Sequence, residues 1–182
     1  MSVPGVVLAA GEGRRFGGPK QLASLAGRPL LAHVVAAARA ALDPVVVVLG
    51  ARASEVRAGV ALDGVRVVEC DEWAEGMSAS LRCGLGALPG ASAVIVLLAD
   101  QPRVTPEVVR AVLAAGAPAR AAYGGVPGHP VLLDAALIAG AAMLRGDAGF
   151  RARLSGVTLV ECGELCDPTD IDTRADLEVV RR

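Results

Sequence analysis

Residues 8–20 have the sequence Leu8-Ala9-Ala10-Gly11-Glu12-Gly13-Arg14-Arg15-Phe16-Gly17-Gly18-Pro19-Lys20, directly after an apolar run that begins at Val3. The run predicts a buried first strand, and the glycines predict a tight turn whose backbone N–H groups face a ligand. Two arginines and Lys20 add positive charge to the same turn. Backbone donors and cations at the end of a parallel strand suit a polyphosphate, which indicates a nucleotide. The alternative is a glycine-rich turn with solvated arginines.

Two familiar phosphate loops do not match this turn. The P-loop needs Gly-Lys-Ser/Thr, whereas here Pro19 precedes Lys20 and Gln21 follows it. The dinucleotide fingerprint G-x-G-x-x-G needs a glycine where Phe16 stands, and no acidic residue ends the second long strand at Leu49-Gly50. The sequence therefore favours a phosphate-binding turn of another type.

The composition predicts one globular domain over residues 1–182. Hydrophobic residues make up 53% of the chain and charged residues 20%, and the net charge is −1. With this charge balance we expect no basic surface that would bind nucleic acid. No apolar run approaches the length that spans a membrane. The four cysteines, Cys70, Cys83, Cys162 and Cys166, form no CxxC pair. We therefore expect four reduced thiols in a cytoplasmic protein.

Short apolar runs alternate with helical patterns along the whole chain. Strands are expected at residues 3–9, 45–49, 65–69, 94–98, 119–123, 131–133 and 157–160. Helices are expected at residues 30–42, 54–60, 78–88, 106–115, 134–144, 148–154 and 174–180. The alternation predicts an α/β fold, a three-layer α/β/α arrangement with a Rossmann-like, mostly parallel sheet. Ligands of such sheets bind at the carboxyl ends of the strands, so the loops there are the place to look for a site.

Acidic residues occur in two such loops. Asp100 closes the apolar run 94–98 and begins Asp100-Gln101-Pro102, which places a carboxylate well for a magnesium ion. Asp170 and Asp172 flank Ile171, so an extended backbone puts both carboxylates on one side, where they repel unless they share a cation or are well solvated. The alternatives are a turn-forming Asp100 and a solvated turn that caps the last helix at Thr173.

Three further places carry candidate polar groups. Ser78 and Ser80 follow Gly76 at a helix start, where they cap the helix or contact a nucleobase or ribose. His129 lies in the glycine-rich segment 124–130, which we expect to be a flexible turn. Asp147, in Gly146-Asp147-Ala148-Gly149, is expected to cap a helix that presents Arg151.

Together these motifs resemble the molybdenum cofactor nucleotidyltransferases, in particular the cytidylyltransferase branch. The resemblance spans nearly the whole chain and rests on Leu8-Ala9-Ala10-Gly11 with Arg15 and Lys20, Gly76-Met77-Ser78-Ala79-Ser80-Leu81, Ala99-Asp100-Gln101-Pro102, Gly128-His129-Pro130, Gly146-Asp147-Ala148-Gly149 and Asp170-Ile171-Asp172-Thr173. Ala10 and the two late aspartates favour the cytidylyl branch over the guanylyl branch. Phe150 departs from the alanine common in the family, which puts the identity of the acceptor in doubt.

The resemblance implies a nucleotide-diphospho-sugar transferase type of fold and a role for each motif. Residues Leu8, Ala9, Ala10, Gly11 and Gly13 would bind the nucleotide. Arg15 and Lys20 would hold its phosphates, and Ser80 would lie near the base or ribose. Asp100, with Asp170 or Asp172, would hold Mg²⁺. His129, Pro130, Asp147 and Arg151 would face the second substrate, a pterin.

The implied reaction is transfer of CMP from CTP to the phosphate of molybdopterin, with release of pyrophosphate. A molybdenum enzyme or its chaperone would be the protein partner. Three alternatives stay open. They are a transferase that uses GTP or another phosphorylated acceptor, an oxidoreductase built on the same fold, and a non-catalytic partner of a molybdenum enzyme. Intact Lys20, Asp100, Asp170 and Asp172 argue against the last.

Overall fold

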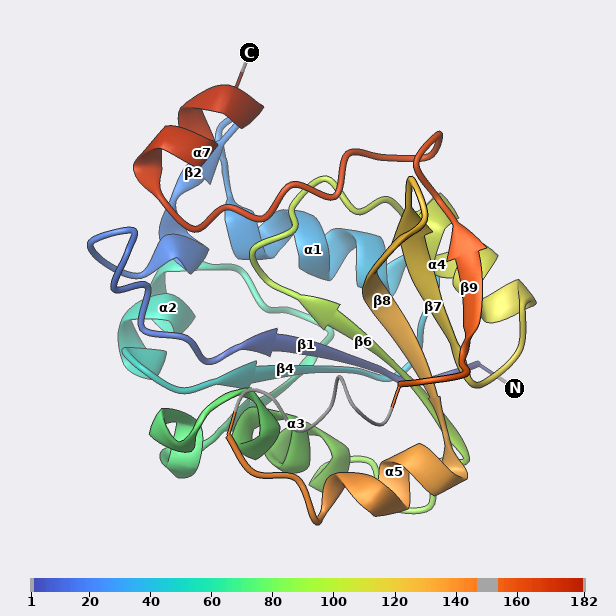
Figure 1. Ribbon diagram of the computed structural model, residues 1–182. Helices are drawn as coiled ribbons and strands as arrows, with labels where there is room; N and C mark the ends of the chain where they lie inside the picture. Colours follow the sequence, from blue (N-terminus) through green and yellow to red (C-terminus); the bar gives the residue numbers. More distant parts are fainter. Residues whose placement is uncertain (1, 147–153, 182) are drawn as a thin grey trace.

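The computed structural model describes residues 2–146 and 154–181 and has one seven-stranded sheet at its centre (Figure 1). The strand order is β5-β4-β1-β6-β8-β7-β9. The strands are β1 (Gly5–Ala9), β4 (Val45–Leu49), β5 (Arg66–Glu69), β6 (Ala93–Leu98), β7 (Ala119–Tyr123), β8 (Val126–Asp134) and β9 (Thr158–Glu161). Neighbours run parallel throughout except for β8, which is antiparallel to both β6 and β7. The predicted mostly parallel sheet is confirmed.

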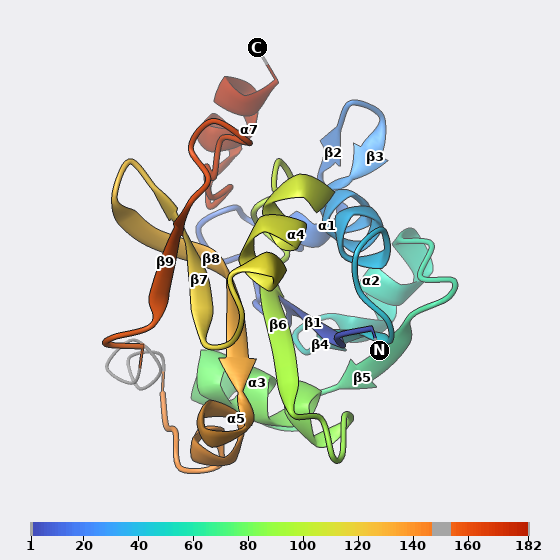
Figure 2. The ribbon, with the colours of Figure 1, turned by 90° about the vertical axis from the view of Figure 1, so that its right-hand side faces the viewer.

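Helices cover both faces of the sheet, as Figures 1 and 2 show. One face carries α1 (Leu30–Arg39), α2 (Ala53–Gly59) and α4 (Pro106–Ala114), and the other carries α3 (Met77–Gly86) and α5 (Ala135–Ala141). Strand β4 shows why its sequence lacks polar alternation. Val45, Val47 and Leu49 join the first core, whereas Val46 and Val48 join the second. A strand covered on both sides is apolar at every position.

A third apolar cluster joins the two ends of the chain. It consists of Phe16, Leu25, Leu30, Ile171, Leu177 and Val180. These residues come from the glycine-rich turn, the small hairpin of β2 (Ser24–Leu25) and β3 (Arg28–Pro29), the start of α1, and α7 (Arg174–Val180) with the segment before it. In Figure 1 α7 accordingly lies beside β2. The cluster holds the late acidic segment next to the first loop.

The predicted bounds are confirmed for β4, β7 and α7, while several expected helices end early. The hairpin β2–β3 and the 3-10 segments η1 (Lys20–Leu22) and η2 (Asp71–Glu75) were not predicted.

The expected flexible turn at 124–130 is wrong in its extent. Gly124 and Gly125 alone make the turn, with φ of 59° and 78°, and β8 begins at Val126. His129 and Pro130 therefore lie in a strand, beside an irregularity in the β7–β8 register. The helix expected at 148–154 falls largely outside the described residues.

Within the described residues, no helix combines the length and apolar character that crossing a membrane requires.

Gly84 lets α3 lie directly on the sheet. A Cβ at this position would be 2.6 Å from a methyl carbon of Val6 and 2.9 Å from one of Val48. We expect Gly84→Ala to lower the free energy of unfolding by about 1–3 kcal/mol, since a packed core resists extra volume. Gly86→Ala in the same helix is the matched control, because nothing lies within 4 Å of its Cβ. Urea denaturation of both variants measures the difference, and equal stabilities would contradict close packing at Gly84.

Candidate functional site

A cavity of about 500 Å³ opens at the carboxyl ends of β1 and β6. Every residue that the sequence assigned to nucleotide or phosphate binding lines it, namely Leu8, Ala9, Ala10, Gly11, Gly13, Arg15, Lys20 and Ser80. Asp100, which the sequence assigned to the metal, lines it too. Further lining residues that the sequence analysis missed include Gln21, Trp73, Ala74 and Met77. The structure thus brings the first loop, the end of β6 and the start of α3 to one hollow.

The glycine-rich turn wraps around a single carbonyl oxygen. The oxygen of Gly13 accepts hydrogen bonds from the backbone N–H groups of Phe16, Gly17 and Gly18, at 3.0, 2.9 and 3.2 Å. Gly13 has a φ of 70°, and a side chain there would overlap the Gly18 carbonyl. Glycine is therefore required at this position by both backbone conformation and space.

Gln21 holds the other carbonyls of the turn. Its Nε2 donates to the carbonyl oxygens of Ala9 and Gly11, at 2.7 and 2.9 Å, and the side chain is 2% exposed. In a trans peptide the N–H points opposite to the C=O, so the N–H groups of Ala10 and Glu12 face away from Gln21. No hydrogen bond within the described chain uses the N–H groups of residues 10–13. The turn therefore keeps free donors for a ligand, as an anion site requires.

Lys20 lies between two acidic segments. Its Nζ is 2.7 Å from Oδ2 of Asp100 and 2.9 Å from Oδ1 of Asp172. The backbone N–H of Ile171 donates to the Asp100 carbonyl at 2.9 Å, which fixes the late segment against the end of β6. Burial lowers the pKa of Lys20, but the carboxylates of Asp100 and Asp172 outweigh it and raise that pKa above its ordinary value. Lys20 is therefore a permanent cation at physiological pH.

Arg15 and Asp170 lie at the edge of this group. The Arg15 guanidinium is 3.0 Å from Oδ2 of Asp172 and its side chain is 74% exposed, so water screens the contact strongly. Asp170 accepts a hydrogen bond from Nε2 of Gln101 at 2.8 Å. Burial and the nearby Asp100 carboxylate raise the pKa of Asp170. The three aspartates predicted as metal ligands thus lie in one region, with Asp170 and Asp172 on the side opposite the buried Ile171.

The carboxylates at this edge suit a divalent cation but do not by themselves complete its set of ligands. Oδ1 of Asp100 is buried and has no hydrogen-bond partner in the structure. Yet within the described residues, no three His, Cys, Asp or Glu side chains form a ready-made metal site. Magnesium commonly uses one or two protein carboxylates and takes its other ligands from substrate phosphates and water. Asp100 with one late aspartate would supply the protein carboxylates of such a site, and substrate phosphates would supply the rest.

Of the two roles that the sequence left open for Ser78 and Ser80, helix capping is not observed. Gly76, with a φ of 109°, occupies the N-cap of α3, and no side chain caps the helix. Ser78 donates to the Gly146 carbonyl instead, which ties α3 to the segment after α5. Ser80 lines the cavity, so it is placed for the second role that the sequence left open, contact with a ligand.

The acceptor residues are only partly placed. His129 lines a second, much smaller cavity that shares Leu8 and Met77 with the first. Pro130 is buried within β8. Asp147 and Arg151 lie outside the described residues. The structure therefore puts one of the four predicted residues, His129, next to the first cavity.

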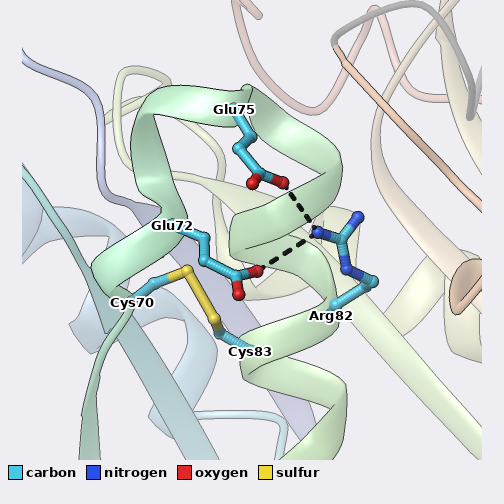
Figure 3. Close-up of a disulfide and its surroundings, with 5 residues drawn as sticks. All are labelled: Cys70, Glu72, Glu75, Arg82 and Cys83. Atoms are coloured by element: carbon cyan, nitrogen blue, oxygen red, sulfur yellow. Dashed lines mark hydrogen bonds and ion pairs between the residues drawn. A yellow bond between two sulfur atoms is a disulfide. The ribbon is translucent and has the colours of Figure 1, made fainter.

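The expectation of four reduced thiols is wrong for two cysteines. Cys70 and Cys83 form a disulfide (Figure 3). Cys162 and Cys166 are free. The pair is 13 residues apart in sequence, and spacing alone gives no signal for it. The bond joins the residue before η2 to the middle of α3 and so cross-links two segments that line the cavity.

A cavity with free backbone donors, cations and carboxylates at the carboxyl edge of this sheet defines a nucleotide-binding α/β protein. The chain belongs to the MobA-like NTP transferase domain family, whose profile matches residues 5–161.

The relatives differ in named activity. Nicotine blue oxidoreductase of Paenarthrobacter nicotinovorans is 37% identical, and the match covers 94% of this chain and 92% of that protein. A 2-C-methyl-D-erythritol 4-phosphate cytidylyltransferase of Cereibacter sphaeroides is 40% identical over 72% of this chain, which spans only 60% of that enzyme.

Solved structures resemble the whole chain. Rv0371c of Mycobacterium tuberculosis H37Rv is 36% identical with a TM-score of 0.84, covering 99% of this chain and 97% of that one. A structure of Rv0371c in complex with manganese is 35% identical with a TM-score of 0.81, covering 99% and 98%.

Replacing Gln21 tests the loop. In Gln21→Met the side-chain volume is kept, but the carbonyls of Ala9 and Gly11 lose their donor. We expect a loss of about 1–3 kcal/mol in the free energy of unfolding, because buried polar groups become unpaired. We also expect affinity for inorganic tripolyphosphate to fall by about tenfold, since the turn no longer holds its N–H groups in place. Calorimetric titration and urea denaturation measure the two effects. Unchanged tripolyphosphate affinity would contradict the role of Gln21.

Proposed function

We propose that this protein is a metal-dependent nucleotidyltransferase that transfers CMP from CTP to the phosphate of a molybdopterin-type acceptor and releases pyrophosphate. Membership of the family supports the reaction class, and the related cytidylyltransferase supports CTP. The molybdopterin acceptor rests on the resemblance of the motifs. The observation that carries the proposal is the position of Lys20, between Asp100 and Asp172 at the cavity that the phosphate loop lines.

The chain's own residues would bind and align two anions. The free N–H groups of residues 10–13 would hold the triphosphate, together with Arg15 and Lys20. An acceptor phosphate oxygen would then attack the α-phosphorus, and the bond from that phosphorus to the pyrophosphate group would break. Lys20 and Arg15 would stabilise the negative charge that builds on the leaving pyrophosphate. This reaction needs no nucleophilic side chain, so orientation and charge are the protein's contribution.

Asp100 would hold the metal together with Asp172 or Asp170. Bound there, a divalent cation would neutralise phosphate oxygens and favour attack at phosphorus. The buried, unpartnered Oδ1 of Asp100 supports this assignment from the protein side. The manganese complex of Rv0371c supports a divalent metal in a similar protein.

The acceptor would enter from the side of His129. The smaller cavity that His129 lines adjoins the nucleotide cavity through Leu8 and Met77. Pro130 would act indirectly, by shaping the strand that carries His129. Asp147 and Arg151 keep the acceptor role that the resemblance implies. A molybdenum enzyme or its chaperone would receive the product.

An oxidoreductase is the second candidate. It is favoured by one observation, the nearly full-length match to nicotine blue oxidoreductase. Against it stand Phe16 in place of the third glycine of the dinucleotide fingerprint and the lack of an acidic residue after β4. The two candidates share a nucleotide and differ in the second substrate.

Product analysis separates these candidates. The protein is incubated with molybdopterin, Mg²⁺ or Mn²⁺, and each of CTP, GTP, ATP and UTP, and the products are identified by mass spectrometry. We expect pyrophosphate and the cytidylylated pterin to form with CTP. Turnover of NADH or NADPH with a dye acceptor, and no nucleotidyl product, would favour the oxidoreductase instead.

Asp100→Asn tests the acidic site. The change keeps the shape of the side chain but removes its charge, so we expect pyrophosphate release to fall by about 10²–10³-fold. Asp63→Asn is the control, since Asp63 is exposed in the loop before β5. Circular dichroism and thermal melting show whether each variant folds. An Asp100→Asn protein that keeps the wild-type rate would exclude Asp100 from the reaction.

A further inference from the structure

Trp73 is the only tryptophan of the chain, and the structure places it in the wall of the nucleotide cavity. It belongs to η2 and packs, half-buried, against the core that includes Ala10. Gly50, at the end of β4, leaves the room for it. A Cβ on Gly50 would be 2.5 Å from the Trp73 Cβ and 2.8 Å from the Ala10 Cβ. The indole therefore sits beside the residue that begins the phosphate-binding turn.

The segment that carries Trp73 is fixed on both sides. The Cys70–Cys83 disulfide ties its start to α3 (Figure 3). Arg82, also in α3, contacts Glu72 at 3.4 Å and Glu75 at 3.3 Å. The same guanidinium donates to the Leu144 carbonyl at 2.7 Å. A wall that is rigid before the ligand arrives loses little conformational entropy on binding, which favours affinity.

The parts of the cavity wall differ in chemistry. The turn after β1 contributes the free N–H groups of residues 10–13 with Arg15 and Lys20. The η2–α3 wall contributes Trp73, Ala74, Gly76 and Met77, none of which is charged. A nucleoside triphosphate needs both kinds of surface, because it has an anionic tail and a flat aromatic base. In a chain with only 2% aromatic residues, the indole in the uncharged wall is the group best suited to stack on that base.

We propose that Trp73 stacks on the base of the bound nucleotide and that the disulfide-stapled η2 segment serves to hold it there. The proposal rests on the proposed nucleotide-binding function and adds the subsite for the base. Stacking tolerates any base, because each has a π-face, so Trp73 contributes affinity rather than a choice of base.

The single tryptophan makes the test direct, because all indole fluorescence comes from Trp73. The protein is titrated with CTP, with GTP and with inorganic tripolyphosphate, which offers the phosphates without a base. We expect both nucleotides to quench the emission in a saturable way. Tripolyphosphate is expected to bind by calorimetry and to leave the emission unchanged. Equal quenching by tripolyphosphate would overturn the proposal.

Substitutions provide the second readout. Trp73→Leu should weaken CTP binding by about tenfold, Trp73→Phe should retain most of it, and tripolyphosphate affinity should stay constant in both. Thermal melting confirms that each variant folds. An equal loss for CTP and tripolyphosphate would mean that Trp73 only shapes the cavity, and unchanged CTP affinity in Trp73→Leu would exclude stacking.

These results are separable from the outcome for the proposed reaction. If CTP quenches Trp73 but no nucleotidyl product forms, the transferase proposal fails while the base subsite stands. If the product forms and Trp73→Leu binds CTP normally, only the stacking proposal fails. If no nucleotide binds at all, both are wrong.

Discussion

The ammonium of Lys20 between Asp100 and Asp172 is the interaction on which the site depends. Asp100 and Asp172 lie 80 and 152 positions after Lys20 in the sequence. Without this cation the Asp100 carboxylate would lose its ion-pair partner, and Asp172 would be left with its contact to the exposed Arg15, where water screens the attraction. Ile171, fully buried and hydrogen-bonded to the Asp100 carbonyl, holds the late segment where the lysine can reach it. The apolar cluster around Phe16 and Leu177 stabilises the same arrangement from outside the site.

Hydrogen bonds to its own carbonyl groups hold the glycine-rich turn in shape. Gly13 uses its oxygen to close the turn, and Gln21 engages the oxygens of Ala9 and Gly11. Because each carbonyl has a partner inside the protein, the N–H groups on the other side of those peptides remain available. The loop therefore needs few side chains to attract an anion. It resembles other phosphate loops in this physical principle while lacking their sequence patterns.

Under the proposed function, this arrangement would explain how relatives with different named activities share similar chains. The glycine-rich turn, Lys20 and Trp73 would bind the nucleotide, and the second substrate would bind near His129 and the smaller cavity. Changes near His129 would then alter the reaction while the sheet and the first cavity stay as they are.

The sequence by itself determined the mostly parallel sheet, the bounds of β4, β7 and α7, and the placing of Lys20 and Asp100 at the carboxyl edge of that sheet. These follow from local apolar runs and from one rule, that carboxyl ends of parallel strands share an edge. Asp176 even completes the capping box of α7, which a glutamate normally fills. Only the tertiary structure decided that Gln21 holds the loop, that Trp73 lines the cavity, that Cys70 bonds to Cys83, and that Ser78 ties α3 to Gly146 instead of capping it. Each of these depends on groups brought together by packing, for which neighbouring residues in the sequence carry no signal.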